Sequence, residues 1–174
     1  MENLLSISRI ENGQMDLHLS SEIVSDVIEE ALRHVDRQAA EHTVTVRDTD
    51  DILLVNMDAR LITQVLINLV NNAVKNTPPG SEICIESRQA GNEAVITVRD
   101  NGPGIADDIK PHVFEMFYTG QNKVADGRRG LGLGLALCKS IVEAHGGRIS
   151  LTDNVPSGCC FTFVLPMKEV EINE

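Results

Sequence analysis

Aromatic residues are scarce in this sequence, which has no Trp, one Tyr and four Phe among its 174 residues. Three of these five aromatic residues lie together in the segment 114–118, Phe-Glu-Met-Phe-Tyr. Because so few aromatic side chains occur elsewhere, this cluster marks residues 114–118 as a candidate functional segment.

Basic residues are also in deficit. The chain has 15 Lys and Arg against 26 Asp and Glu, a net charge of −11. A nucleic-acid-binding protein usually carries a basic excess that neutralises phosphates, so the composition argues against this class. The sequence also lacks the run of about 20 apolar residues that a membrane-spanning helix needs, and it shows no secretory signal peptide.

The cysteines form no recognisable metal-binding or disulfide pattern. The four are Cys84, Cys138, Cys159 and Cys160, and none belongs to a Cys-x-x-Cys pair. This spacing argues against a zinc site, and a chain of this length does not need a disulfide scaffold. A reducing, cytosolic compartment fits best.

The chain length predicts one domain with a short additional segment. Apolar residues at helical spacing predict helices from the caps Ser20-Ser21-Glu22 to Val35, over 59–76 and over 133–144. Alternating or apolar runs predict strands at 15–19, 43–47, 52–55, 83–87, 94–99, 148–152 and 160–165. We therefore expect an α+β fold, a two-layer α/β sandwich with three helices on one face of a mixed sheet.

Residues 100–132 do not continue this succession of predicted helices and strands. They contain six glycines, and only one short helix is expected, near 109–114. An irregular segment of about 30 residues is uncommon in a compact domain unless it has a function.

The helix predicted over 59–76 has an unusual polar face, formed by Gln64, Asn68, Asn71, Asn72 and Lys75. Asn is a poor helix former and costs about half a kcal/mol at each position. A merely solvated face would favour Glu, Lys and Arg instead. Amide oxygens suit Mg²⁺, which takes its other ligands from phosphates and water, and an ammonium group can neutralise phosphate charge. The pattern therefore favours a metal–nucleotide site over a solvated surface.

The segment Asp100-Asn-Gly-Pro-Gly104 directly follows a predicted strand. Taken alone it is an ordinary turn. As part of a nucleotide site, the Asp100 carboxylate could accept a hydrogen bond from the amino group of adenine, whereas the guanine carbonyl would repel it. Gly102 and Gly104 would let the backbone approach the ring closely.

Glycine alternates with leucine in Gly130-Leu-Gly-Leu-Gly134, just before a predicted helix. Such a segment presents backbone N–H groups that can bind phosphates. It lacks the spacing of a dinucleotide-binding Gly-x-Gly-x-x-Gly motif and the Gly-Lys-Ser/Thr of a P-loop, so both common nucleotide folds are disfavoured.

Four motifs together resemble a known family. They are Asn68-x-x-x-Asn72-x-x-Lys75, Asp100-x-Gly-x-Gly104, Phe114-x-x-Phe117 and Gly130-x-Gly-x-Gly134. In order and spacing they resemble the N, G1, F and G2 boxes of the catalytic ATP-binding domain of bacterial sensor histidine kinases, which has the Bergerat fold. Residues 136–147 and 161–166 look closest to the KdpD-like potassium-sensing branch of these kinases.

The resemblance implies roles for individual residues. It implies that Asn72 is the Mg²⁺ ligand with Asn68 beside it, that Lys75 meets phosphate, and that Asp100 reads adenine. It makes Asn68 and Lys75 the catalytic pair and residues 118–131 a mobile lid. The remaining ATP-binding residues that it implies are Gly102, Gly104, Ile105, Phe117, Tyr118, Arg129, Gly130, Leu131, Gly132, Leu133 and Gly134.

The chain departs from the family pattern at three positions. Thr119 stands where many relatives have a basic residue, so Lys123, Arg128 or Arg129 could contact the γ-phosphate instead. Leu131 replaces the usual Thr or Ser of the second glycine box. Asn76 replaces a frequent aromatic residue, so a stacking contact with adenine is not expected there.

The predicted reaction is phosphoryl transfer from MgATP to a histidine. Relatives that hydrolyse ATP have a Glu at the position of Asn68, and an amide cannot take a proton from water. None of the five histidines is followed by an acidic residue, the usual context of the acceptor. We therefore expect the acceptor upstream, on a dimerisation domain, with relay to an Asp of a response regulator.

The implied domain organisation divides the chain into three parts. Residues 1–14 are expected to be the end of the second dimerisation helix, 15–167 the catalytic domain and 168–174 a tail. We expect this chain to be a monomeric cytoplasmic domain without nucleic-acid or membrane contact, and its parent a homodimer in the bacterial inner membrane. The alternatives are a nucleotide-sensing pseudokinase and a serine kinase of the anti-sigma type.

Overall fold

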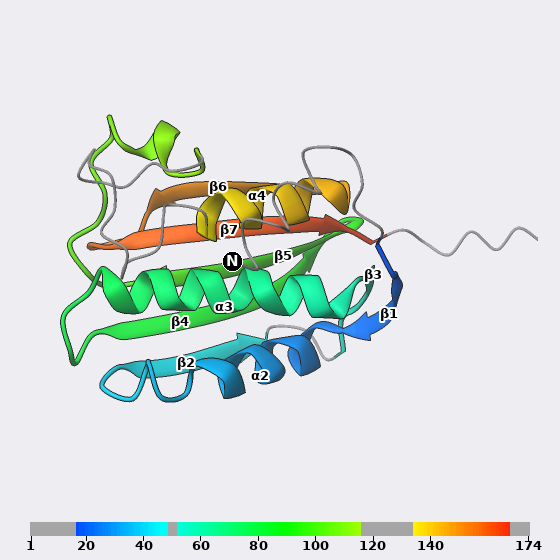
Figure 1. Cartoon of the computed structure of the whole chain (residues 1–174), viewed down its shortest axis with the longest axis horizontal. Helices are drawn as coiled ribbons and strands as arrows, with labels where there is room; N and C mark the ends of the chain where they lie inside the picture. Colours follow the sequence, from blue (N-terminus) through cyan, green and yellow to red (C-terminus); the bar gives the residue numbers. More distant parts are fainter. Residues whose placement is uncertain (1–16, 49–51, 116–133, 168–174) are drawn as a thin grey trace, which may run out of the picture.

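A computed structural model describes residues 17–48, 52–115 and 134–167. In these ranges three helices pack on one face of a five-stranded sheet, and a two-stranded sheet lies at one end (Figure 1). The helices are α2 (Val24–Val35), α3 (Ala59–Lys75) and α4 (Gly134–Ala144), with a 3₁₀ turn η1 (Lys110–His112). The strands are β1 (Ser20–Ile23), β2 (Thr43–Asp48), β3 (Leu54–Met57), β4 (Glu82–Ala90), β5 (Glu93–Asp100), β6 (Arg148–Asp153) and β7 (Cys159–Pro166).

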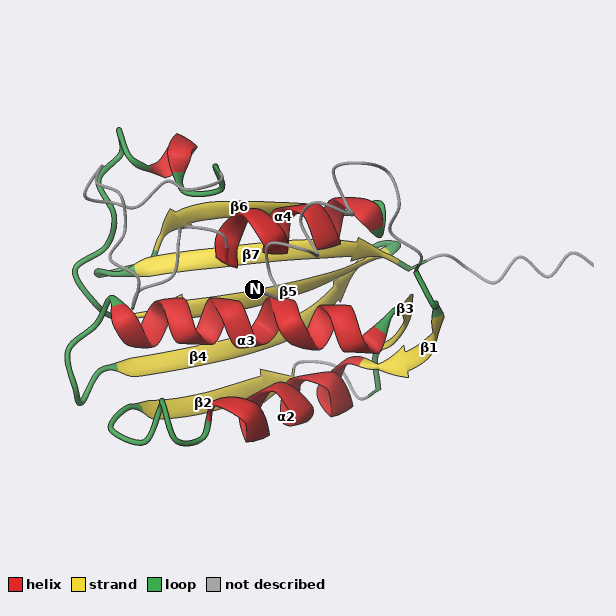
Figure 2. Cartoon of the chain, viewed as in Figure 1, coloured by secondary structure: helices red, strands yellow, loops and turns green. Residues whose placement is uncertain are grey.

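The larger sheet has the order β2-β4-β5-β7-β6. Strand β2 pairs with β4 in parallel, and the other neighbours are antiparallel, so the sheet is mixed. Figure 2 shows the helices as one layer over this sheet. The predicted α+β sandwich is confirmed.

Helix α3 lies between α2 and α4 and forms the centre of the helical layer (Figure 1). The apolar residues whose spacing predicts this helix form its core-facing side, although Leu61 is only partly buried. The buried residues of α3 are Ile62, Val65, Leu66, Leu69, Val70 and Ala73. Burial of each larger side chain contributes about 1.5–3 kcal/mol, so this stripe fixes which helix face is left for polar residues.

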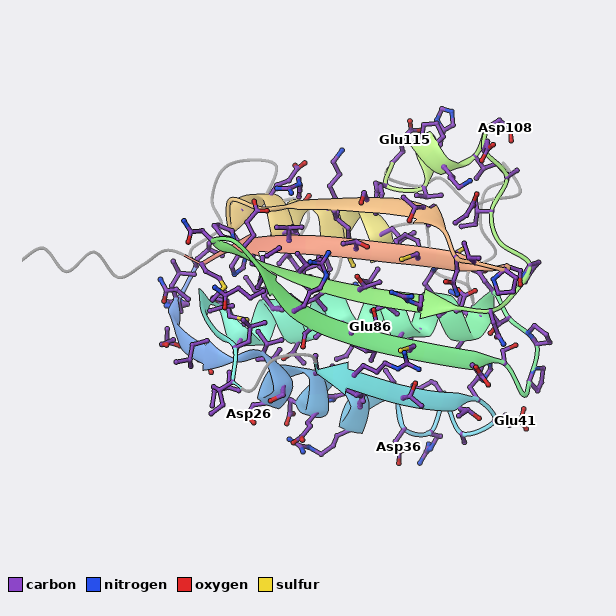
Figure 3. All side chains as sticks on the ribbon, turned by 180° about the vertical axis from the view of Figure 1, so that it is seen from behind. Asp26, Asp36, Glu41, Glu86, Asp108 and Glu115 are labelled. Atoms are coloured by element: carbon purple, nitrogen blue, oxygen red, sulfur yellow. The ribbon has the colours of Figure 1, made fainter. Side chains whose placement is uncertain are left out.

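The opposite sheet face carries charged side chains, as the view from behind shows (Figure 3). Glu86 on β4 pairs with Arg99 on β5, with 2.6 Å between Oε1 and Nη2, and more loosely with Arg47 on β2. Asp100, one residue after Arg99, faces the other way, because its cross-strand partner Ile83 is buried in the core beneath the helices. Strand β5 therefore places Asp100 on the face of the sheet that the helices cover.

The N-terminal part of the domain differs from the prediction. Residues Ser20 and Ser21 do not cap a helix but belong to β1, which pairs with β3. Helix α2 begins at Val24, and the preceding residue Ile23 makes no side-chain cap. The backbone N–H and C=O groups of these residues instead form hydrogen bonds with β3, whose residues lie more than 30 positions further along the chain.

The other differences are small. The hairpin strands β4 and β5 are longer than predicted and meet at Gly91 and Asn92. The short helix expected near 109–114 is the single 3₁₀ turn η1. No helix in the described ranges is long and apolar enough to cross a bilayer.

The buried thiol of Cys138 leads to a prediction about alkaline stability. Burial raises the pKa of Cys138 from its ordinary value of 9.0 to about 12, and the thiol donates a hydrogen bond to the Val65 carbonyl at 3.7 Å. The folded state holds this proton where the unfolded state releases it. The stabilising contribution is therefore complete below pH 9 and is lost as the pH rises from 9 towards 12, by about 2 kcal/mol at roughly pH 10.5.

The measurement is the free energy of unfolding in urea at neutral and alkaline pH. Between neutral pH and roughly pH 10.5, the free energy of unfolding of Cys138→Ala should fall by about 2 kcal/mol less than that of the unmutated chain. The variant should nevertheless be less stable at neutral pH, because the substitution leaves a cavity. Equal alkaline losses in both proteins would show that the Cys138 thiol is not responsible.

Candidate functional site

The polar face of α3 places its amides beside the start of α4. Gln64 Nε2 donates to Asn68 Oδ1 at 3.0 Å, and Asn68 Nδ2 donates to the Gly134 carbonyl at 3.3 Å. A Cβ atom added to Gly134 would lie 3.9 Å from Asn68 Cγ. Asn68 therefore fixes the first turn of α4, and with it the end of the second glycine box, against α3.

The neighbouring asparagines lie on the same face. Asn71 and Asn72 are half-buried, while Lys75 is exposed at the end of the helix. The Asn71 Oδ1 atom is buried and accepts no hydrogen bond from the described residues. An unpaired buried oxygen is costly, so Asn71 Oδ1 is an acceptor that a donor outside the described residues would satisfy.

Asp100 lies at the end of β5 and is 5% exposed. Its Oδ1 atom accepts hydrogen bonds from the backbone N–H of Gly102 at 2.9 Å and of Cys159 at 3.2 Å. Among the described residues, no donor reaches Oδ2. One carboxylate oxygen is thus held by the protein, and the other remains for an incoming donor.

The turn after Asp100 packs against the end of α3. A Cβ atom on Gly102 would lie 2.5 Å from Thr77 Cγ2, so a larger residue would push the turn and the helix end apart. Gly104 has a positive φ of +86°, which favours glycine. The Thr77 hydroxyl donates to the Ala73 carbonyl at 2.8 Å and lies 2.9 Å from His42 Nε2. Both glycines predicted from the sequence therefore have a structural reason at this site.

The segment that follows the turn is attached to the core and to β6. Ile105 packs against the core, and Phe114 meets Phe161 edge to face, with ring centroids 6.0 Å apart. Lys110 bonds to Asp107, which raises the pKa of Lys110, and its Nζ lies 2.8 Å from Asp153. These contacts fix residues 105–115 beside the Asp100 turn.

Several predicted site residues lie outside the described ranges. They are Phe117, Tyr118, Arg129, Gly130, Leu131, Gly132 and Leu133, together with Lys123 and Arg128. Their roles stay predictions. In the described ranges no three His, Cys, Asp or Glu residues form a group that could hold a metal ion.

Sequence reasoning missed three residues that contact Asp100. They are Asn154, Gly158 and Cys159, which lie in and after the loop between β6 and β7. The Pro-Ser-Gly sequence at 156–158 is typical of a turn, but no local pattern indicates that this turn touches residue 100.

The fold and the site define a two-layer α+β domain with an amide-bearing helix and a carboxylate at a strand end. Residues 57–169 match the family described as Histidine kinase-, DNA gyrase B-, and HSP90-like ATPase. The chain belongs to this family.

Relatives with similar sequences are sensor kinases. The chain is 41% identical over 166 residues to the sensor protein KdpD of Clostridium acetobutylicum, covering 95% of this chain and 18% of that protein. It is 32% identical over 168 residues to KdpD of Escherichia coli, covering 97% of this chain and 18% of that protein. The chain thus spans about a fifth of the length of these relatives.

Solved structures of histidine kinases have the same fold as this chain. The catalytic domain of histidine kinase ThkA superposes with a TM-score of 0.77 at 29% identity, covering 88% of this chain and 97% of that one. Histidine kinase AdeS of Acinetobacter baumannii gives 0.78 at 28% identity, covering 97% and 77%. The resemblance to the catalytic domain of sensor histidine kinases is confirmed, and KdpD is among its relatives.

Proposed function

We propose that this domain binds MgATP and donates the γ-phosphate to a histidine on the dimerisation domain of a sensor histidine kinase. The observation that carries the proposal is the arrangement along α3. Its C-terminal end contacts the Asp100 turn through Thr77 and Gly102, and nine residues earlier Asn68 holds the start of α4. From Asn68 to Lys75, the last residue of α3, the helix rises about 10 Å. The next two residues extend this distance to the Asp100 turn, which gives a length suited to a nucleoside triphosphate lying along the amide face.

In this arrangement each end of the nucleotide has a partner. Asp100 accepts a hydrogen bond from the adenine amino group through the carboxylate oxygen that the protein leaves unused. Asn72, with Asn68 beside it, supplies amide oxygens for Mg²⁺, and Lys75 meets phosphate. Bound Mg²⁺ would neutralise phosphate charge and orient the γ-phosphate.

Transfer is favoured over hydrolysis by the chemistry of Asn68. Its amide has no proton-accepting ability near neutral pH, so it cannot activate a water molecule as a general base. Catalysis of phosphoryl transfer is mainly positioning and charge neutralisation, so the domain needs an acceptor held in line with the γ-phosphate.

None of the histidines within the described ranges is followed by an acidic residue, and several make other contacts. His42 contacts Thr77, His34 contacts Glu30, and His145 Nε2 accepts from the Asp58 N–H at 3.1 Å. We therefore place the acceptor on the dimerisation domain upstream. A response regulator would receive the phosphoryl group, as the solved complex of ThkA with the response regulator TrrA suggests by analogy. The parent protein would be a homodimer at the inner membrane with this domain in the cytoplasm.

The experiment that tests this function separates donor from acceptor. The chain is mixed with γ-labelled ATP and a polypeptide that carries the upstream helices of the parent protein. We expect label on that polypeptide, in an acid-labile and base-stable bond to His, and none on the chain alone. Phosphate release without acceptor should be slow, because Asn68 does not activate water.

The alternatives give different results. A nucleotide-sensing pseudokinase would bind MgATP but label no polypeptide. A serine kinase of the anti-sigma type would label a hydroxyl group in a bond that survives acid. Either result, or stable label on the chain itself, would contradict the proposed function.

A further inference from the structure

The loop between β6 and β7 is joined to the end of β5 by a side chain that the proposed function does not use. Asn154 Nδ2 donates a hydrogen bond of 2.7 Å to the backbone carbonyl of Asp100. The Asn154 backbone N–H donates to the Gly158 carbonyl at 2.9 Å, which closes the loop on itself. Asn154 is half-buried, so this contact is partly shielded from water.

The hydrogen bond replaces a strand contact. The last pair between β5 and β7 is Arg99 with Cys160, and Asp100 lies one residue beyond it. Its carbonyl is therefore at the point where the β7 ladder ends, and the Asn154 amide satisfies it instead. Of the hydrogen bonds in the described ranges that join Asp100 itself to the β6–β7 side, Asn154 holds the backbone carbonyl and Cys159 holds the side chain.

Gly158 shows how closely the loop meets Asp100. Its φ is +109°, and a Cβ atom there would lie 1.9 Å from the Asp100 carbonyl oxygen. The next residue, Cys159, donates its N–H to Asp100 Oδ1. Residues 154–159 therefore hold both the backbone carbonyl and one carboxylate oxygen of Asp100.

We propose that Asn154 is a positioning residue that sets the nucleobase specificity of the site, by holding the Asp100 backbone so that its second carboxylate oxygen is directed at the base. The inference rests on the proposed function, in which Asp100 reads an exocyclic amino group. The Gly102 N–H fixes the carboxylate only relative to its own turn. The Cys159 N–H and the Asn154 amide fix the same residue relative to the β6–β7 side of the sheet, the first through its side chain and the second through its backbone carbonyl.

The test compares two nucleotides that differ in the amino group. ATP has it, and purine riboside triphosphate lacks it. Asn154→Ala should weaken MgATP binding about five- to tenfold, the effect of one hydrogen bond, and should change purine riboside triphosphate binding less than twofold. The ratio of the two affinities, measured by calorimetry on the full 174-residue chain, is the readout.

Two further variants keep the test interpretable. Asn56→Ala removes an exposed asparagine on β3, far along the chain from the loop, and should leave both affinities unchanged. Asn154→Asp keeps the side-chain shape but places an oxygen against the Asp100 carbonyl, so it should lower the affinity ratio at least as much as Asn154→Ala. It also serves if the alanine variant does not fold, as judged by circular dichroism.

The outcomes separate the inference from the function on which it rests. If the unmutated chain binds both nucleotides equally, Asp100 does not read the amino group, and the base-reading role falls together with this inference. If the unmutated chain prefers ATP and the Asn154 variants keep the same preference, only the inference is overturned. A reduced preference in the folded Asn154 variants, with Asn56→Ala unaffected, is the expected result.

Discussion

Asn72→Ala is expected to abolish phosphoryl transfer while leaving the fold in place. Asn72 is half-buried on the polar face of α3, whereas the core stripe of the helix is formed by other residues. In the proposed function it supplies an amide oxygen to Mg²⁺. A metal ion that stabilises transferring phosphate contributes several kcal/mol, so the rate of transfer should fall about a thousandfold or more.

The measurement is the initial rate of label transfer to the separate dimerisation polypeptide, together with nucleotide affinity at several Mg²⁺ concentrations. Asn72→Asp is the matched variant, because it retains an oxygen ligand at the same position and should keep part of the activity. Circular dichroism checks that all three proteins are folded. If Asn72→Ala binds nucleotide with unchanged Mg²⁺ dependence, the polar face of α3 is only a solvated surface.

Asp100→Asn should weaken ATP binding by about 1.5–3 kcal/mol, or roughly 10- to 150-fold. The structure indicates why this conservative change is so disruptive. Oδ1 accepts two backbone N–H groups, from Gly102 and Cys159, so an amide at this position would keep its oxygen there. Its NH₂ group would then occupy the place of Oδ2 and face the amino group of adenine, donor against donor.

Asp100→Asn should also gain affinity for guanine nucleotides. The new NH₂ group can donate to the guanine carbonyl, so GTP should bind Asp100→Asn better than it binds the unmutated chain, in which a carboxylate would face that carbonyl. Calorimetry with MgATP and MgGTP on both proteins checks both expectations. Equal affinity of the unmutated chain for ATP and GTP would exclude base reading by Asp100.

The helical layer and the polar face of α3 could be predicted from the sequence because their signals are local. Apolar residues recur at helical spacing from Ile62 to Ala73, and this period alone assigns the buried face of α3. The opposite face then follows from geometry. The asparagines at 68, 71 and 72 were placed correctly on that face for this reason, although the contacts of Asn68 with Gln64 and Gly134 were not predicted.

The N-terminal segment shows where such local signals fail. Ser20, Ser21 and Glu22 have the composition of a helix cap, yet they form a strand with Leu54–Met57. The cap competes with a ladder of backbone hydrogen bonds whose partner is more than 30 residues away. A local pattern carries no information about a partner at that distance. The residues 20–22 therefore favoured a helix cap over the strand that they form.

Three features could be read from the sequence, namely the order of the elements, the buried face of α3 and the position of Asp100 at a strand end. This was possible because periodicity and turn composition act over a few residues. The tertiary structure alone decided the surroundings of Asp100. The register of β5 with β7 brings Asn154, Gly158 and Cys159, more than 50 residues further along the chain, against its carbonyl and carboxylate. These contacts depend on how strands align across the sheet, and that alignment is fixed by the packing of the whole core.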